Sequence, residues 1–212
     1  MPVEVKVKVN ERFGNLASDI IVEKTVSALK SNGINVYVVN NGEEAKKKVL
    51  EIIPKDSEVM NMTSTTLLTI NLEQEINELG KFNSIRNKLN SMNQKTQGQD
   101  MKRLGAAPEW VIGSVHAVTQ DGHLFIASQT GSQLPAYAYG AKNVIWVIGT
   151  QKIVENFDKA FKRLYEYCFP LEDQRALKVY GTHSGVNKIL IVNKEVASER
   201  ITVIFVKENI GF

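Results

Sequence analysis

Cysteine is nearly absent from this chain, since Cys168 is the only one in 212 residues. A single thiol excludes a disulfide within the chain and any zinc or iron–sulfur site built from several of its cysteines. Cys168 lies in FKRLYEYCFP, where the apolar spacing favours a packed thiol. The three histidines do not occur at metal-ligand spacing such as HxxxH. The sequence therefore predicts no metal site and no evident cofactor.

A strong charge of one sign and a long apolar run are also missing. The 26 Lys and Arg residues nearly balance the 23 Asp and Glu residues, for a net charge of +3. Such a balance argues against a nucleic-acid partner, which calls for a basic face. No apolar stretch approaches the roughly 20 residues that span a bilayer, and MPVEVKVKVNERFG lacks the apolar core of a signal peptide. We expect a cytoplasmic protein that binds neither nucleic acid nor membrane.

The first third of the chain alternates between helical and strand patterns. Residues 15–31 and 43–53 have the apolar spacing of helices, whereas 34–39 and 57–62 are short, apolar and strand-like. Strand, helix and strand in this order are typical of a parallel sheet with crossover helices. The segment from about 72 to 107 is polar, with sparse apolar residues at helical intervals. We expect two or three exposed helices there, as a cap over a site or an oligomer contact.

Strand-like sequence patterns return after Pro108. Residues 109–128 predict two strands joined by a hairpin at Gln120-Asp121-Gly122. NVIWVIG (143–149) is continuously apolar, which predicts a strand buried on both faces in the sheet centre. A helix is expected from about 152 to 167, with an inner side formed by Val154, Phe157, Phe161, Leu164 and Tyr165. Strands are expected at 188–193 and 201–206. The prediction is a single α/β domain over 1–212, with a mostly parallel sheet flanked by helices and a polar helical insertion around 72–107.

Two loops that join a predicted strand to a predicted helix are rich in hydroxyl side chains. The first contains Thr63, Ser64, Thr65 and Thr66. Hydroxyls beside a helix N-terminus can form an anion site with the free N–H groups, or one of them can simply cap the helix. Both readings stay open for this loop.

The second hydroxyl-rich loop is SQTGSQ, with Gln129, Thr130, Gly131 and Ser132. Gly131 permits a close backbone approach or a positive φ. Ligands of open α/β sheets gather outside the carboxyl ends of the strands, and both loops are expected at that edge. Neither loop matches the P-loop or the GxGxxG pattern, so no nucleotide fingerprint is supported.

Three residues are candidates to complete a pocket between these loops: His183, Lys152 and Glu172. His183 lies in GTHSG, a glycine-flanked loop that precedes a strand. Glu172 belongs to PLEDQRA, where an ion pair with Arg175 is the alternative interpretation. His116 alternates with apolar neighbours and is favoured as a structural histidine. The catalytic residues stay unknown at this level.

The block GSVHAVTQDGHLFIASQTGSQLPAYAYGAKNVIWVIGTQKIV (113–154) is the most specific part of a resemblance that covers nearly the whole chain. With MTSTTL upstream and RITVIFVKENIGF at the end, it resembles the lactate-utilisation (LUD) domain family, closest to its stand-alone members. The resemblance implies a single α/β domain similar to ribose-5-phosphate isomerase and CoA transferases. Better-described relatives act beside iron–sulfur subunits in a complex that oxidises L-lactate to pyruvate.

Two acidic positions of those relatives differ here. Where they carry an AETGT-like stretch, this chain reads Ser128-Gln129-Thr130-Gly131-Ser132, and Gln129 replaces the carboxylate. Against their G-x-S-x-T-x-D-I run, residues 181–189 keep a serine at Ser184 but place Lys188 at the acidic position. The loop is therefore suited to binding, without the acidic groups of the lactate complex.

Three functional hypotheses follow from the residues and the resemblance. The first is a protein that binds a small anionic metabolite, a carboxylate or sugar phosphate, at loops 63–66 and 128–133. The second is a non-catalytic interaction subunit of a redox assembly, whose iron–sulfur partner subunits carry the metal centres. The third, an isomerase or CoA transferase, rests on fold analogy alone. A homo-oligomer is a further prediction, with 72–107 as one contact.

Overall fold

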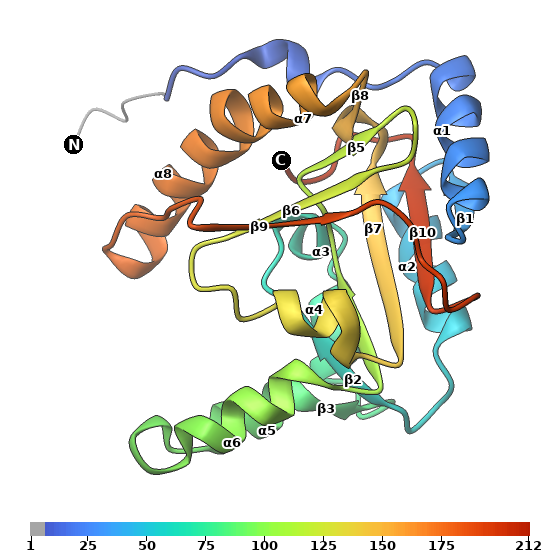
Figure 1. The fold of residues 1–212 in the computed structure, drawn as a ribbon. Coiled ribbons are helices and arrows are strands. Elements are labelled where there is room, and N and C mark those ends of the chain that lie inside the picture. The colour runs from blue at the N-terminus through green and yellow to red at the C-terminus, as the bar shows by residue number, and fades with distance from the viewer. Residues whose placement is uncertain (1–6) are drawn as a thin grey trace.

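Six parallel strands form the central sheet of the molecule (Figure 1). The structure is a computed structural model that describes residues 7–212. The strand order is β1-β10-β7-β4-β2-β3, and every neighbouring pair is parallel. Their bounds are β1 (Asn35–Val39), β2 (Glu58–Asn61), β3 (Asn83–Ser84), β4 (Trp110–Gly113), β7 (Asn143–Gly149) and β10 (Ile201–Val206). The predicted α/β class with a mostly parallel sheet is confirmed.

The continuously apolar strand NVIWVIG is β7, and its side chains feed both faces of the sheet. Val144, Trp146 and Ile148 belong to one buried cluster, while Ile145 and Val147 belong to another. Side chains alternate along a strand, so an apolar run without alternation signals a strand covered on both faces. The predicted burial of 143–149 is confirmed, since Val144 to Ile148 are all fully buried.

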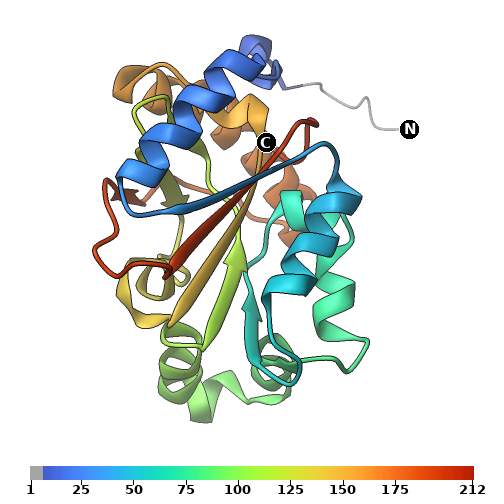
Figure 2. The same cartoon turned by 90° about the vertical axis from the view of Figure 1, so that its right-hand side faces the viewer.

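Helices cover both faces of the sheet, with α1 and α2 on opposite sides (Figure 2). Leu29 of α1 packs into the cluster of Trp146, whereas Ala45 and Val49 of α2 pack into that of Ile145. The helices are α1 (Asp19–Ser31), α2 (Gly42–Ile52), α3 (Thr65–Thr69), α4 (Leu72–Asn77), α5 (Ile85–Ser91), α6 (Gln94–Ala106), α7 (Phe157–Arg163) and α8 (Phe169–Tyr180). Short 3-10 or π turns are η1 (Glu11–Gly14), η2 (Ala136–Gly140), η3 (Thr150–Lys152) and η4 (Leu164–Cys168).

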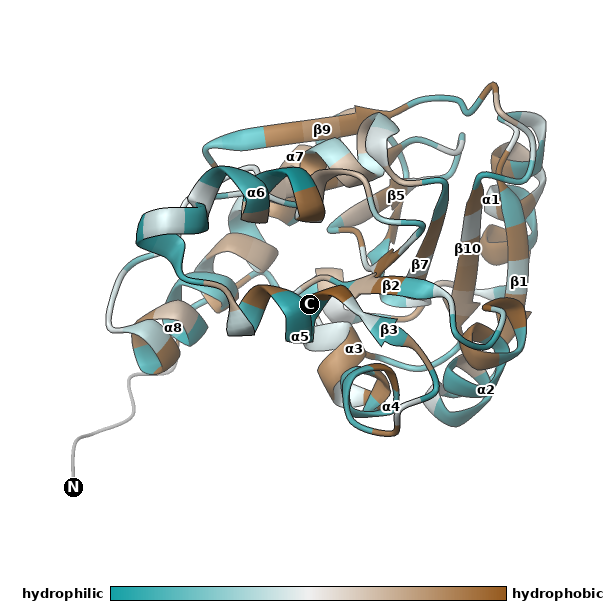
Figure 3. Cartoon of the chain, turned by 90° about the horizontal axis from the view of Figure 1, so that it is seen from below, coloured by the Kyte–Doolittle hydropathy of each residue, from teal (hydrophilic) through white to brown (hydrophobic). Residues whose placement is uncertain are grey.

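The predicted insertion at 72–107 is helical and contains α4, α5 and α6. The short strand β3 lies between α4 and α5. Leu72 and Ile76 of α4 are buried, whereas α6 has no buried residue. Figure 3 shows α6 as mainly hydrophilic. No helix within residues 7–212 is long and apolar enough to cross a membrane.

A second, four-stranded sheet has the order β8-β5-β6-β9. Its strands are β5 (Ala117–Thr119), β6 (Leu124–Ser128), β8 (Ile153–Val154) and β9 (Lys188–Val192). The hairpin predicted at 120–122 is confirmed, with Gly122 at φ 87°. The single strand expected before it is wrong, because the chain leaves the central sheet after Gly113 and enters this one at Ala117. The strand predicted at 188–193 is β9, which pairs antiparallel with β6.

The helix expected at 152–167 differs in its bounds and in its buried face. Residues 150–152 form η3, and the helical path runs from Phe157 to Tyr180 through the π turn η4. Pro170 lies in the first turn of α8, where its missing N–H is tolerated. Phe157, Phe161 and Tyr165, expected on the inner side, are 36%, 37% and 50% exposed. Leu164, expected on the same side, is buried, and so are Ala160 and Arg163, so the buried face contains a cation.

Gly140 should tolerate no side chain, because α6 ends directly against it. A Cβ built on Gly140 would overlap the carbonyl oxygen of Ala106, which is backbone and cannot rotate away. We expect Gly140→Ala to lower the free energy of unfolding by about 1–3 kcal/mol. Gly98→Ala in α6 is the matched control, since nothing lies within 4 Å of its added Cβ. It should stabilise by about 0.5–1 kcal/mol. Urea unfolding of both variants checks the pair, and equal effects would contradict the close approach.

Candidate functional site

Four strands of the central sheet end at one edge, and the residues that follow them converge on Lys152. Lys152 follows β7 and donates to Thr66 Oγ1 at 3.0 Å, Ser114 Oγ at 3.1 Å and Val115 O at 3.2 Å. Thr66 follows β2, Ser114 follows β4, and Thr66 Oγ1 also donates to Ile210 O beyond β10 at 3.4 Å. We call Thr66, Ser114, Val115 and Lys152 the lysine cluster. It occupies the carboxyl edge at which ligands of open α/β sheets bind.

The ammonium of Lys152 is buried among neutral groups. The residue is 2% exposed, and its ammonium donates hydrogen bonds to two hydroxyls and one carbonyl oxygen. Within residues 7–212, no carboxylate lies within ion-pair distance of it. Burial, and secondarily the nearby Arg163 charge, lowers the pKa of Lys152 to about 7. Ammonium and amine are therefore both populated near neutral pH.

Arg163 is a second buried cation beside the lysine cluster. It is 0% exposed and donates to the carbonyl oxygens of His116, Gln151 (3.4 Å) and Phe13 (3.3 Å), and to Cys168 Sγ at 2.8 Å. These acceptors come from four separate segments of the chain. Buried charges are ordinarily paired with opposite charges, whereas both cations here rest on neutral acceptors. The edge therefore carries an excess of positive charge.

His116 lies close to both cations and remains neutral. Its Nδ1 accepts a hydrogen bond from the Ala127 N–H at 3.1 Å. Desolvation, followed by repulsion from Lys152 and Arg163, lowers the pKa of His116 to about 3. The hydrogen bond to the hairpin fits the structural role that the sequence favoured.

Glu73 approaches the N-terminus of α3, where the first hydroxyl-rich loop enters the helix. Burial raises the pKa of its carboxyl, while Arg86, the Ser64 amide and the Asn61 side chain act in the opposite direction. Arg86 Nη2 donates to Asn61 O at 2.7 Å. Asn61 Oδ1 and Glu73 Oε1 are buried without a hydrogen-bond partner within residues 7–212. An acid of the chain itself thus lies where an external anion was expected.

The second hydroxyl-rich loop contacts the loop before β9. Gln129 Nε2 donates to His183 O at 3.0 Å, and Lys188 Nζ donates to Thr130 O at 2.9 Å. Thr130 Oγ1 lies 3.2 Å from Ser132 Oγ. Gly131 has the positive φ that the sequence predicted, at 88°. These residues form one region with His183 and Ser184.

His183 and Glu172 each contact a different side chain of this protein. His183 Nδ1 lies 2.9 Å from Asp173 Oδ2, and the imidazole side chain is 73% exposed. The Ser184 N–H donates to Asp173 Oδ1 at 2.7 Å, and these two partners hold the pKa of Asp173 below its usual value. Glu172 forms a bidentate ion pair with Arg175 at 2.7 Å for both contacts. The ion pair was the alternative interpretation of Glu172, and it is what the structure shows.

The structure brings the sequence candidates together in two groups. Lys152 and Thr66 share the lysine cluster, with Thr63, Ser64 and Thr65 in the segment just before Thr66. Gln129, Thr130, Gly131, Ser132, His183 and Ser184 form the other group. In the part of the chain that the structure describes, no hydrogen bond joins 63–66 to 128–133. The expectation of one common sheet edge is wrong, because β6, which precedes 128–133, belongs to the second sheet.

Sequence reasoning missed Ser114, Arg163 and the pair of Asn61 and Glu73. Ser114 could have been found as the first polar residue after an apolar strand, in the same position as Thr63 after β2. Arg163 had no such signal, since a cation on the buried face of a helix looks like any solvated charge. Among residues 7–212, no group of three or more His, Cys, Asp or Glu side chains could hold a metal ion.

The LUD domain family model matches residues 22–206, which contain the whole lysine cluster. The chain belongs to the LUD domain family. The crystal structure of a DUF162 family protein from Deinococcus radiodurans is similar over 91% of this chain and 99% of that one, with 10% identity and a TM-score of 0.55. At that identity the likeness shows the fold of this LUD domain and nothing about its ligand.

Weaker likenesses are to the crystal structures of eIF2B beta and eIF2B delta from Chaetomium thermophilum. The first has 13% identity and a TM-score of 0.37, and covers 56% of this chain and 44% of that one. The second has 14% identity and a TM-score of 0.32, and covers 68% and 54%. No curated protein sequence matches this LUD-domain chain. The family resemblance predicted from the sequence is confirmed.

Proposed function

We propose that this LUD-domain protein binds a small organic anion, a carboxylate or sugar phosphate, at the lysine cluster. One observation carries the proposal: the buried ammonium of Lys152 contacts two hydroxyls and a carbonyl, and no acid among residues 7–212. A buried charge without a counter-ion is costly, and an anionic ligand would supply the missing charge.

The chemistry of the cluster supports an anion. Thr66 and Ser114 can each turn a hydroxyl proton toward a ligand oxygen, and Lys152 can donate a charge-assisted hydrogen bond, which is stronger than a neutral one. Arg163 adds a second positive charge next to this position. Because Lys152 is 2% exposed, the ligand must displace one of its present partners. Of these partners, Thr66 belongs to the first hydroxyl-rich loop, 63–66.

The finer predictions rest on the family resemblance. A part in the oxidation of lactate or a related organic acid would need iron–sulfur partner subunits, because this chain has one cysteine. In that case the lysine cluster would hold the acid, while the electrons would pass to the partner. These predictions await the identity of the ligand.

Anion binding is expected to depend on Lys152 and on pH. Isothermal titration with lactate, pyruvate, inorganic phosphate and ribose 5-phosphate should identify at least one ligand at pH 6.5. The same ligand should bind roughly 100-fold more weakly at pH 9, because about 1% of Lys152 side chains would then be protonated. The amine form offers no charge to the anion.

A matched pair of variants separates the cluster from general surface charge. Lys152→Met should abolish binding, whereas Lys162→Met, which removes an exposed lysine of α7, should leave it unchanged. Equal binding by Lys152→Met and the parent would refute the proposed site. Binding that survives at pH 9 without loss would refute the role of the ammonium.

A further inference from the structure

Strand β1 forms an open edge of the central sheet. Within the described residues it pairs with β10 alone. Figure 2 shows β1 at the front of the sheet, with α1 and α2 to either side and no element over its outer edge. An uncovered edge strand is a template for pairing with another strand.

The backbone of β1 offers hydrogen-bonding groups on that edge. The Lys207 N–H donates to Val39 O at 3.0 Å, so the peptide groups of Val39 face β10. Peptide groups alternate along a strand, which turns the N–H and C=O groups of Val36 and Val38 outward. Val36 and Val38 can therefore exchange hydrogen bonds with an antiparallel strand at this edge.

The side chains at this edge are apolar although they are accessible. Tyr37 is 44% exposed, Val38 is 40% exposed, and Ile20 on the neighbouring helix α1 is 80% exposed. Between α1 and β1 runs a groove of about 430 Å³. It is lined by Asp19, Val22, Glu23, Val26, Ser27, Lys30, Val38 and Lys207. Valine side chains line the floor of the groove and charged side chains line its rim. Protein–protein interfaces commonly have such an apolar centre and a polar rim.

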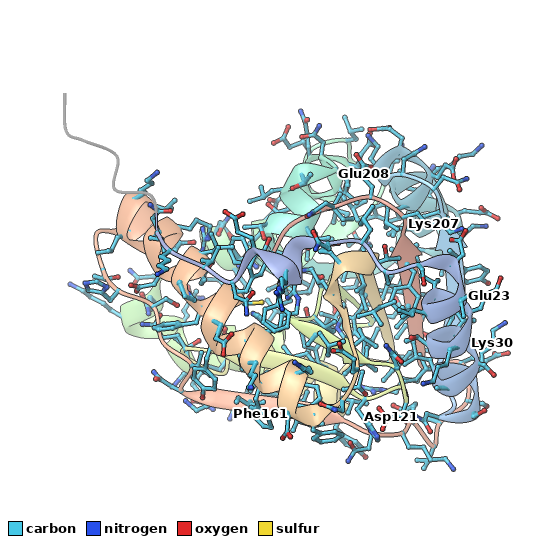
Figure 4. All side chains as sticks on the ribbon, turned by 90° about the horizontal axis from the view of Figure 1, so that it is seen from above. Glu23, Lys30, Asp121, Phe161, Lys207 and Glu208 are labelled. Carbon is cyan, nitrogen blue, oxygen red and sulfur yellow. The ribbon has the colours of Figure 1, made fainter. Side chains whose placement is uncertain are left out.

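The charges along the groove are ordered from one end to the other. Asp19 and Glu23 lie toward the N-terminal end of α1, and Lys30 lies toward its C-terminal end (Figure 4). Asp19 is paired with Lys207 at 2.6 Å. Glu23 and Lys30 have no ion pair within residues 7–212. A surface with an acidic end and a basic end complements itself when it is turned by a two-fold rotation.

We propose that β1 pairs antiparallel with β1 of a second copy of this chain, in a two-fold dimer that joins the two central sheets. Val36 of each copy then exchanges both backbone hydrogen bonds with Val38 of the other. The axis passes through Tyr37, so the two Tyr37 residues lie directly opposite each other. The two α1 helices run antiparallel on the same face of the joined sheet, and Glu23 of one meets Lys30 of the other.

A disulfide placed on the axis tests this geometry. Directly opposed residues in a non-hydrogen-bonded antiparallel pair have Cα atoms about 4.5 Å apart, within the range of a disulfide. Tyr37→Cys should therefore form a covalent dimer under mild oxidation and return to monomer with reductant. The native thiol does not interfere, because Cys168 is buried. Val179→Cys is the control, since Val179 is 59% exposed on α8, and it should stay monomeric.

Light scattering of the parent protein completes the first test. The expected result is twice the monomer mass at micromolar concentration and a covalent dimer for Tyr37→Cys only. A monomer at every concentration overturns the proposal. So does equal cross-linking of Tyr37→Cys and Val179→Cys, which would mark random collision, or a dimer that Tyr37→Cys does not cross-link.

A charge reversal tests the register independently. Glu23→Lys and Lys30→Glu should each weaken the dimer roughly tenfold, because like charges would then face each other twice across the axis. The double variant should restore dimerisation. Lys162→Glu on α7 is the control and should leave it unchanged. If the double variant is as weak as the single ones, Glu23 does not face Lys30 and the proposed register is wrong.

Discussion

Lys152→Met is expected to stabilise the folded protein near neutral pH and to remove a large part of its pH dependence. Burial lowers the pKa of Lys152 from 10.5 to about 7, a difference that corresponds to about 5 kcal/mol of unfavourable charge burial. Methionine fills a similar volume without a charge. Replacing a buried ionic group by an apolar one commonly stabilises by about 1–4 kcal/mol, and we expect about 2 kcal/mol at pH 6.5.

The lost hydrogen bonds do not offset this gain, because the two hydroxyl partners of Lys152 keep other hydrogen bonds. Thr66 Oγ1 already lies 3.3 Å from Ser114 Oγ and 3.4 Å from Ile210 O. Ser114 Oγ lies 3.5 Å from Val115 O. The variant therefore leaves Val115 O with the largest deficit, because its remaining donor, the Ser114 hydroxyl, lies at 3.5 Å.

The sign of the pH dependence follows from proton uptake. Between pH 7 and pH 10 the unfolded chain keeps a proton on Lys152 that the folded protein has released. Stability of the parent must then rise with pH in this window, by about 1.4 kcal/mol per pH unit, and fall as the pH drops toward 7. Lys152→Met lacks this term. The two stability curves should converge above pH 7 and cross at about pH 8.5, where the parent has gained about 2 kcal/mol.

Urea unfolding at intervals from pH 6 to pH 10 measures both curves. Lys162→Met serves as the control, and its curve should run parallel to that of the parent. Parallel curves for Lys152→Met and the parent would mean that Lys152 keeps an ordinary pKa. The interpretation of Lys152 as a buried cation without a counter-ion would then be wrong.

The elements of the central sheet could be predicted because their signals are local. NVIWVIG is apolar at every position that faces a helix layer, and Asn41 caps α2 by accepting from the Glu44 N–H at 3.0 Å. The division into two sheets could not be predicted. Residues 114–116 (Ser-Val-His) alternate polar and apolar side chains as a continuing strand would, so they do not show that the chain crosses to a second sheet.

The candidate site shows the same limit. Thr66 and Lys152 were found because hydroxyls and a lysine follow strands, which is a local pattern. Their separation from Gln129 and Gly131 depends on which sheet β6 joins, and that choice is made by pairing with the distant strand β9. The exposed aromatics of α7 mislead for a related reason. Phe157 and Phe161 pack edge-on against Phe125, with ring centroids 5.0 and 5.4 Å apart, while they remain partly exposed. Their apolar character therefore did not show which face of the helix is buried, and so did not show that Arg163 lies on that face.

Arg163→Met should have the opposite effect from Lys152→Met and destabilise the protein by about 3–5 kcal/mol. Both residues are buried cations, but their partners differ. Lys152 contacts two hydroxyls that can bond elsewhere, whereas Arg163 donates to the main-chain oxygens of His116, Gln151 and Phe13. Leaving a buried acceptor unsatisfied costs about 1–3 kcal/mol for each group.

Arg163 also joins segments that lie far apart in the sequence. Phe13 belongs to η1, His116 connects the two sheets, and Gln151 lies in η3 directly before Lys152. Its guanidinium also stacks 5.1 Å from the Tyr167 ring. Methionine keeps the volume of the side chain, so its loss of stability measures the hydrogen bonds and the stacking. Chemical denaturation at pH 7.5 gives the free energy, with Arg103→Met as control, because the Arg103 side chain is 74% exposed.

The double variant Lys152→Met/Arg163→Met separates charge repulsion from hydrogen bonding. If the two cations repel each other across the sheet edge, each single change already relieves that repulsion, so the double variant should be less stable than the sum of the single effects predicts. Strict additivity would mean that the positive charges do not interact. Since Arg163 contributes to the lowered pKa of Lys152, we expect the double variant to fall below additivity. Arg163→Met alone should then raise the pKa of Lys152, and its stability should rise less steeply between pH 7 and pH 10 than that of the parent.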